Sequence, residues 1–198
     1  MTTSPVLTWE ILENRGYETA WARRTETSLH ARGRAVGMTP EPYWISYSLR
    51  TGDGFVTREL RVTAESADGV RELVLRHDGT GRWTVGGEPR PDLDGALDCD
   101  LGLCPLTNTM PVLRHGLHRS GGEREFRMAW VSVPDLTVYA STQTYTRLEG
   151  TGDGGALIRF VSGDFRREVE FDADGFVVDY PGLARLVGRG ESPARDHG

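Results

Sequence analysis

The sequence predicts a mainly β protein in which a strongly curled antiparallel sheet of many strands packs against a single short α-helix. Three observations lead to this fold class. Apolar and polar residues alternate with a period of two in several segments, as in half-buried strands. Short turns rich in glycine and aspartate separate these segments. Only one segment has apolar residues at helical spacing. The 198 residues are expected to form one domain.

The alternation predicts four strands most clearly. Their inward residues are expected to be, in chain order, Tyr43, Ile45, Tyr47 and Leu49; Val56, Leu60, Val62 and Ala64; Phe126, Met128 and Trp130; and Val169 and Phe171. Most residues between them are polar or charged, and Thr57 is expected on the outward face of the second strand. One apolar and one polar face indicate an antiparallel sheet.

Four turns are predicted at residues 51–54, 77–82, 150–155 and 172–175, because glycine and aspartate tolerate positive φ. The last, Asp-Ala-Asp-Gly, is also similar to the start of a calcium loop. Its twelfth position is Leu183 instead of glutamate, so a hairpin turn is the better interpretation. Residues 188–198 are expected to be a disordered tail.

The segment 106–117 departs from the period of two. Its apolar residues share one face of a helix: Leu106, Met110, Leu113 and Leu117. Pro111 must lie in the first turn, and Gly116 is expected to end the helix. Thr107, Asn108 or Thr109 is expected to cap its start. A lone helix among many strands must bury its apolar face against the sheet.

Composition excludes several function classes. The net charge of −6 argues against nucleic acid and against an anionic membrane surface as partners. All 23 basic residues are arginine, which excludes a Schiff-base or P-loop lysine. No signal peptide and no membrane-spanning apolar stretch is seen, so a cytoplasmic protein with reduced Cys99 and Cys104 is expected.

Residues 98–118 carry the candidate chemistry. Cys99 and Cys104 do not have zinc-knuckle spacing, and no second pair follows, so neither a metal nor another cofactor is expected. A hydrolase or metal enzyme would use Cys104 with Asp98, Asp100 and His115, or His118 as the base. This is the weakest of three hypotheses, because both histidines could instead cap the helix C-terminus.

A polar cluster at the start of the predicted helix leaves more than one interpretation open. It consists of Thr107, Asn108, Thr109 and Arg114. Buried polar groups need partners, and these could be supplied by one another in an internal cap network, by the edge of the sheet, or by the hydroxyls of a ligand. Arg114 could form a salt bridge with Asp98 or Asp100, or it could clamp a phosphate or carboxylate head group.

Several blocks, taken together, resemble a bacterial family called "putative glycolipid-binding". They are TRELRV (57–62), GTGRWTVGG (79–87), LDCDLGLCPLTNTMPVLR (97–114), STQTYTRLE (141–149) and DADGFVVDYPGLARLV (172–187). The resemblance implies a long antiparallel sheet rolled as a spiral or half-barrel around one α-helix, often as a dimer. The shape is similar to lipoprotein carriers that hold acyl chains, and the family assigns no catalytic residue.

The leading hypothesis is therefore non-enzymatic binding of a lipid-like or glycolipid-like amphiphile in the cavity of the roll. Aromatic inner positions such as Tyr43, Tyr47, Phe126 and Trp130 would supply apolar walls. The candidate ligand-binding residues are Asp100, Thr107, Asn108, Arg114, Trp130, Gln143, Tyr145, Asp179 and Tyr180. The alternative is a structural module that forms a homodimer through a sheet face or edge and has no small-molecule ligand.

Overall fold

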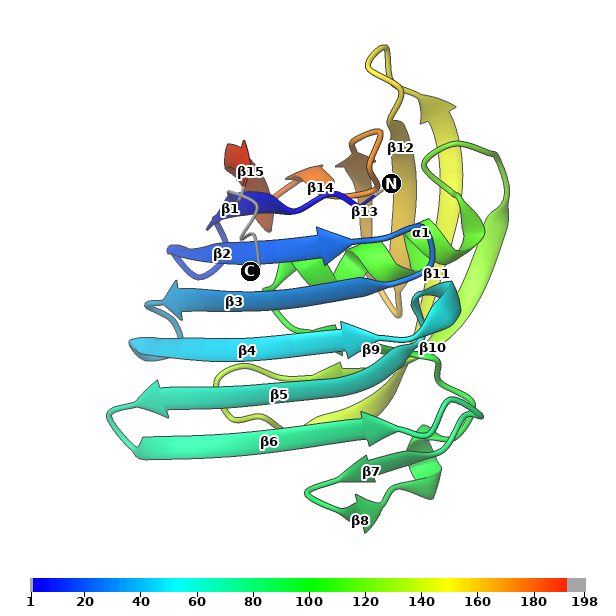
Figure 1. The fold of residues 1–198 in the computed structure, drawn as a ribbon. Helices are drawn as coiled ribbons and strands as arrows, with labels where there is room; N and C mark the ends of the chain where they lie inside the picture. Colours follow the sequence, from blue (N-terminus) through cyan, green and yellow to red (C-terminus); the bar gives the residue numbers. More distant parts are fainter. Residues whose placement is uncertain (1, 192–198) are drawn as a thin grey trace, which may run out of the picture.

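The computed structural model describes residues 2–191, and within this range fifteen strands form one open sheet (Figure 1). From one edge, the order runs backward along the chain from β8 to β1. Strand β1 pairs with β15, and the order then runs backward again to β9 at the other edge. The mainly β prediction is confirmed. The prediction of a purely antiparallel sheet is wrong at one edge, because the edge strand β9 pairs with β10 in parallel.

The N-terminal half of the sheet contains β1 (Pro5–Ile11), β2 (Gly16–Arg24), β3 (Leu29–Gly37), β4 (Tyr43–Thr51), β5 (Thr57–Ser66), β6 (Gly69–His77), β7 (Trp83–Val85) and β8 (Glu88–Pro89). The C-terminal half contains β9 (Asp98–Leu101), β10 (Glu123–Val131), β11 (Val138–Gly150), β12 (Ala156–Ser162), β13 (Phe165–Phe171), β14 (Val177–Tyr180) and β15 (Ala184–Glu191). The helical segments are η1 (Asp53–Phe55), η2 (Pro91–Leu93), η3 (Pro105–Asn108) and α1 (Thr109–His115). All four predicted turns lie between consecutive strands of this order.

The edge strand β9 is buried inside the curled sheet. The backbone N–H of Thr57 donates to the carbonyl of Leu97 at 3.0 Å, and the backbone N–H of Cys99 donates to Thr57 Oγ1 at 3.1 Å. These bonds tie β9 to β5, so part of the edge that an open sheet would expose is satisfied internally. Thr57 is fully buried for this reason, which corrects its predicted outward position.

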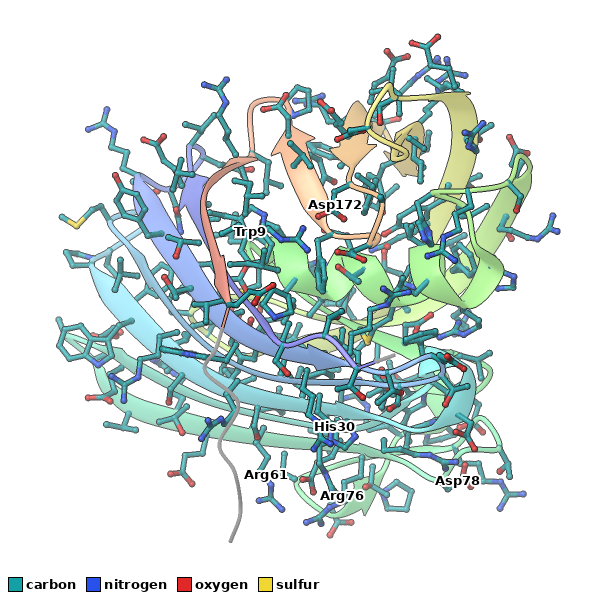
Figure 2. All side chains as sticks on the ribbon, turned by 45° about the horizontal axis from the view of Figure 1, so that its top comes forward. Trp9, His30, Arg61, Arg76, Asp78 and Asp172 are labelled. Atoms are coloured by element: carbon teal, nitrogen blue, oxygen red, sulfur yellow. The ribbon has the colours of Figure 1, made fainter. Side chains whose placement is uncertain are left out.

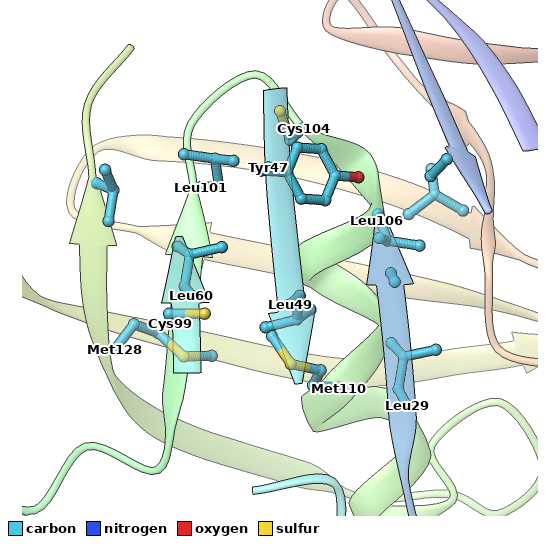
Figure 3. Packing of buried hydrophobic residues seen from close by; sticks show 14 of the residues in the cluster. Leu29, Tyr47, Leu49, Leu60, Cys99, Leu101, Cys104, Leu106, Met110 and Met128 are labelled. Carbon is cyan, nitrogen blue, oxygen red and sulfur yellow. The ribbon is translucent and has the colours of Figure 1, made fainter. Parts of the chain in front are cut away.

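The single α-helix lies in the interior, and its apolar face packs on the inner face of β3–β5 and on β9 (Figure 3). The four predicted apolar positions are all buried: Leu106, Met110, Leu113 and Leu117. Gly116 ends the helix in a left-handed conformation with φ of 60°, as predicted. The predicted side-chain cap is wrong. The first turn is η3, and Asn108 at the N-cap makes no capping bond.

Two further strand predictions need correction. The C-terminal part of β10 is buried on both faces, because Ala129 and Val131 are covered as completely as Met128. Residues 188–191 belong to β15 instead of a disordered tail, because they pair with β1 from Thr8 back to Pro5. The remainder of the predicted tail, residues 192–198, lies outside the described residues.

A buried carboxyl group joins the sheet to the helical segment. Glu18 points inward from β2 and is completely buried. Its carboxylate oxygens accept hydrogen bonds from the Tyr47 hydroxyl and, at 3.4 Å, from the backbone N–H of Leu106 in η3. Burial raises the pKa of Glu18 to about 8 despite these bonds, so the neutral form is favoured inside the fold.

Candidate functional site

An open cavity of about 400 Å³ lies between the inner face of the C-terminal half of the sheet and the segment that leads from β9 into η3. Its volume falls within the range of small-molecule sites. The lining residues are Glu13, Asp100, Leu101, Gly102, Leu103, Cys104, Pro105, Asn108, Trp130, Val133, Tyr139, Ser141, Gln143, Phe160, Ser162, Phe165, Tyr180 and Leu183.

Aromatic rings from five strands form the walls of the cavity. The rings of Trp130 on β10 and Tyr139 on β11 lie 4.7 Å apart. Phe160 on β12 makes edge contacts with Phe165 at 6.0 Å and with Tyr180 at 5.9 Å. These residues face the same space because the register places Trp130 opposite Tyr139 and because inward positions alternate along each strand. The walls are therefore apolar and built on rigid strands.

The floor of the cavity is a chain of buried hydrogen bonds. Asp100 Oδ2 accepts from Gln143 Nε2 at 2.5 Å, and Asp100 Oδ1 accepts from Thr107 Oγ1 at 2.9 Å. The Tyr145 hydroxyl donates to Gln143 Oε1 at 3.3 Å and accepts from Asn108 Nδ2 at 3.1 Å. A carboxylate can accept about four hydrogen bonds, so Asp100 retains acceptor capacity toward the cavity.

The electrostatics of this floor are one-sided. Asp100 and Glu13 both line the cavity, whereas no arginine or histidine is among its described lining residues. Burial raises the pKa of Asp100, and the hydrogen bonds from Gln143 and Thr107 oppose that rise. The arrangement disfavours phosphate and carboxylate groups. It suits neutral ligands with several hydroxyl groups, which can donate to the carboxylate and exchange hydrogen bonds with the amides.

The structure brings together seven of the nine predicted ligand-binding residues. Five of them line the cavity: Asp100, Asn108, Trp130, Gln143 and Tyr180. Thr107 and Tyr145 lie immediately behind the lining, where they hold Asp100, Gln143 and Asn108 in place. Thr107 and Asn108 of the polar cluster therefore bond the sheet at Asp100 and Tyr145. Thr107 Oγ1 also lies 3.0 Å from the carbonyl oxygen of Cys104 at the start of η3, and the buried Thr109 hydroxyl has no hydrogen-bond partner among the described residues. Asp179 is outside the cavity and bonds Arg185 at 3.3 Å.

Arg114 also lies outside the cavity, so the predicted clamp on a phosphate or carboxylate head group is not formed there. It makes a bidentate ion pair with Asp98, the alternative foreseen from the sequence. Its Nε and Nη2 also donate to the carbonyls of Gly54 at 2.8 Å and Phe55 at 3.3 Å. Arg114 therefore fastens α1 to β9 and η1.

The surroundings of Cys104, His115 and His118 differ in burial. Cys104 is buried, and burial raises the pKa of its thiol, which works against a nucleophilic thiolate. His115 is exposed, whereas His118 is buried. Within residues 2–191, no three side chains of the histidine, cysteine, aspartate or glutamate type are arranged to hold a metal ion.

Three aromatic residues of the cavity wall were missed by the sequence prediction: Tyr139, Phe160 and Phe165. Phe160 could have been found, because Ala156, Ile158 and Phe160 alternate as inward residues of β12. Tyr139 is exposed at the cavity mouth, and exposed aromatic residues carry no burial signal.

Comparisons with known proteins agree with this architecture. The chain is similar to a DUF1089 family protein from Pseudomonas aeruginosa, with 33% identity, a TM-score of 0.71, and coverage of 85% of this chain and 91% of the other. It shares its fold with a β-barrel-like protein of DUF1849 from Brucella abortus, at 8% identity and a TM-score of 0.53, over 96% of this chain and 98% of the other.

None of the curated proteins matches this chain. Among the described residues, no helix has the length and apolar character needed to cross a membrane. The family model described as "Putative glycolipid-binding" matches residues 6–186, which is most of the sequence. The chain therefore belongs to the "putative glycolipid-binding" family.

Proposed function

We propose that this protein binds a glycolipid-like amphiphile without transforming it, and that the neutral sugar head group occupies the cavity. One observation carries the proposal: the aromatic walls enclose a floor of Asp100, Gln143 and Asn108 that contains no cation. Carboxylate and amide groups exchange hydrogen bonds with vicinal hydroxyls, and aromatic rings pack against the apolar faces of sugar rings. The family description supports this assignment.

The size of the cavity limits which part of the ligand it holds. About 400 Å³ is near the lower end of the range for small-molecule sites, so it suits a head group better than a whole two-chain lipid. The acyl portion would leave through the open mouth, past Leu103, Val133 and Leu183. These aliphatic side chains offer apolar contact where the chain emerges.

Isothermal titration calorimetry with octyl glucoside, below its micelle concentration, tests the proposal. We expect saturable binding at one site, and much weaker binding of octyl phosphate because the described lining holds no cation to pair with the anion. Trp130→Ala should weaken the binding of octyl glucoside by about tenfold or more, as for the loss of an aromatic contact. Trp44→Ala removes an exposed indole outside the cavity and serves as the matched control.

Asp100→Asn separates the charge of the floor from its shape. The amide oxygen can still accept from Thr107, and rotation of the Gln143 amide would let its oxygen accept from the new NH2 group. The substitution removes the ionisable carboxyl group, so octyl phosphate should gain affinity relative to octyl glucoside. Absence of octyl glucoside binding, or equal affinity for both probes in the natural protein, would contradict the proposal. Unchanged binding in Trp130→Ala would place the ligand elsewhere.

A homodimer without a small-molecule ligand remains the second candidate, and exposed apolar residues on the outer face of the sheet favour it. Tyr17, Val36 and Trp44 lie opposite one another on β2, β3 and β4, and each is about half exposed. Contiguous exposed apolar residues commonly mark a protein interface. Light scattering of the natural protein and Trp44→Asp tests this candidate, which predicts a dimer that the substitution dissociates.

A further inference from the structure

The outer face of the N-terminal half of the sheet contains a hollow of about 640 Å³, separate from the cavity. Its floor forms on β4, where Ser46 and Ser48 occupy outward positions between the larger Trp44 and Arg50. Thr63 on β5 lies opposite Ser46 and extends the floor. Small side chains flanked by large ones thus create a depression in the outer surface of the sheet.

Three arginines surround this floor. Arg32 and Arg34 project from β3 and lie opposite Ser48 and Ser46, and Arg61 projects from β5 on the far side of Ser48. Strands two apart in a sheet are separated by about 10 Å, so guanidinium groups from β3 and β5 can converge over the serines between them. Figure 2 shows Arg61 on the side of the sheet that faces away from α1.

The positive charges of the hollow are poorly compensated. The side chains of Arg32 and Arg34 make no hydrogen bond or ion pair with any described residue, and no acidic residue is among the described lining. Arg61 is anchored from outside by Glu59, with N···O distances of 3.0 and 2.9 Å. Arginine stays charged at all physiological pH values, so these groups repel one another until an anion enters.

The other lining groups indicate the shape of that anion. The hydroxyls of Ser46, Ser48 and Thr63 have no described partner and can donate to it. Three guanidinium groups and three hydroxyls match the several oxygens and higher charge of a phosphoryl group better than a carboxylate. Trp21, opposite Arg32 and 45% exposed, forms a wall suited to a planar organic group.

We propose that this hollow binds a phosphate monoester, with its phosphoryl group held by Arg32, Arg34 and Arg61 and its planar organic part against Trp21. A flat anionic bilayer fits less well, because the serine and threonine floor lies below the level of the surrounding side chains. The proposal is independent of the function assigned to the cavity, which lies on the inner face of the other half of the sheet.

Isothermal titration calorimetry with phenyl phosphate and inorganic phosphate tests the proposal. We expect one site for both probes, with tighter binding of phenyl phosphate. The double variant Arg32→Gln/Arg34→Gln should weaken both by at least about tenfold. Arg166→Gln makes the same kind of charge change at an exposed position of β13 and should leave both affinities unchanged. Trp21→Ala should remove the preference for phenyl phosphate but retain binding of inorganic phosphate.

Two further measurements keep the test decisive. Ser46→Leu fills the hollow without changing any charge, and it should abolish binding of both probes. Sedimentation with vesicles of phosphatidylcholine and phosphatidylglycerol examines the competing partner. Vesicle binding without saturable binding of either soluble phosphate would overturn the proposal in favour of a membrane surface. Equal losses in Arg166→Gln and the double variant would reduce it to nonspecific charge attraction.

Discussion

Replacing Glu18 by glutamine should change how the stability of the protein depends on pH. The carboxyl group is completely buried on β2, and burial raises its pKa from 4.5 to about 8. Between these two pH values the folded chain retains a proton that the unfolded chain releases. The free energy of unfolding contributed by this group is therefore greatest below pH 4.5 and is lost as the pH rises through 8.

The magnitude follows from the two pKa values. Each pH unit in this window costs about 1.4 kcal/mol, so ionisation of Glu18 in the unfolded chain costs about 3 kcal/mol at pH 7 and about 5 kcal/mol above pH 8. Glutamine cannot ionise, and this slope should disappear. Its amide can donate to the Tyr47 oxygen while its carbonyl accepts from the N–H of Leu106, so both contacts of the natural side chain remain possible.

Urea unfolding at pH 5, 6, 7 and 8, followed by tryptophan fluorescence, measures this effect. The free energy of unfolding of the natural protein should decrease from pH 5 to pH 8. In Glu18→Gln this decrease should be smaller by roughly 3–4 kcal/mol. Glu88→Gln changes an exposed glutamate and should leave the pH dependence as it is in the natural protein. Parallel stability curves for the natural protein and Glu18→Gln would refute the assignment of a neutral buried carboxyl group.

Three other substitutions examine the contacts around the helix and the sheet. Arg114→Ala leaves Asp98 buried without its partner, so urea unfolding should show a free energy of unfolding lower by about 3–5 kcal/mol. A decrease below about 1 kcal/mol would show that the ion pair does not fasten α1. Gly33→Ala places a Cβ in the space that the Tyr47 ring occupies, so overpacking should cost about 1–3 kcal/mol. An unchanged unfolding midpoint would mean that the ring moves freely. Burial and then Arg119 lower the pKa of His118 from 6.5 to about 4, so stability should fall by up to about 3 kcal/mol as the pH decreases from 6.5 to 4. His118→Leu should remove this acid-side loss, and an unchanged slope in acid urea titrations would contradict it.

The sequence predicted the parts of the fold that depend on local periodicity. The alternation over β4 and the spacing from Leu106 to Leu117 were correct, because burial on one face imposes those periods directly. Strand β1 carries the same signal, since Leu7, Trp9 and Ile11 alternate with polar or less buried residues, and it could have been predicted. The buried position of Thr57 could not, because it depends on contact with β9, forty residues later.

The candidate site was predictable in part for a comparable reason. Asp100 in β9 and Asn108 in the segment that follows it are polar residues in a buried stretch, which indicates partners elsewhere. Those partners are Gln143 and Tyr145 respectively. The sequence did not decide which aspartate Arg114 would pair with, because Asp98 and Asp100 lie on the same face of β9. In the structure, the carbonyls of η1 accept hydrogen bonds from the Arg114 guanidinium and hold it beside Asp98. The local sequence does not encode the position of η1 relative to the helix, so this pairing could not be predicted.

The fold segregates charge, so the net charge of the chain does not describe either the cavity or the hollow. The chain carries −6 overall, yet Arg32, Arg34 and Arg61 surround a hollow whose described lining contains no acid. The described lining of the cavity has the opposite character, with Asp100 and Glu13 but no arginine. An attractive field extends only about a Debye length, near 8–10 Å in physiological salt, so each site responds to its own lining instead of the average. The cavity should therefore reject the phosphorylated ligands that the hollow favours, and a neutral sugar would leave the guanidinium groups of Arg32 and Arg34 in the hollow without a counter-charge. Octyl glucoside and phenyl phosphate should accordingly bind the same molecule without competing.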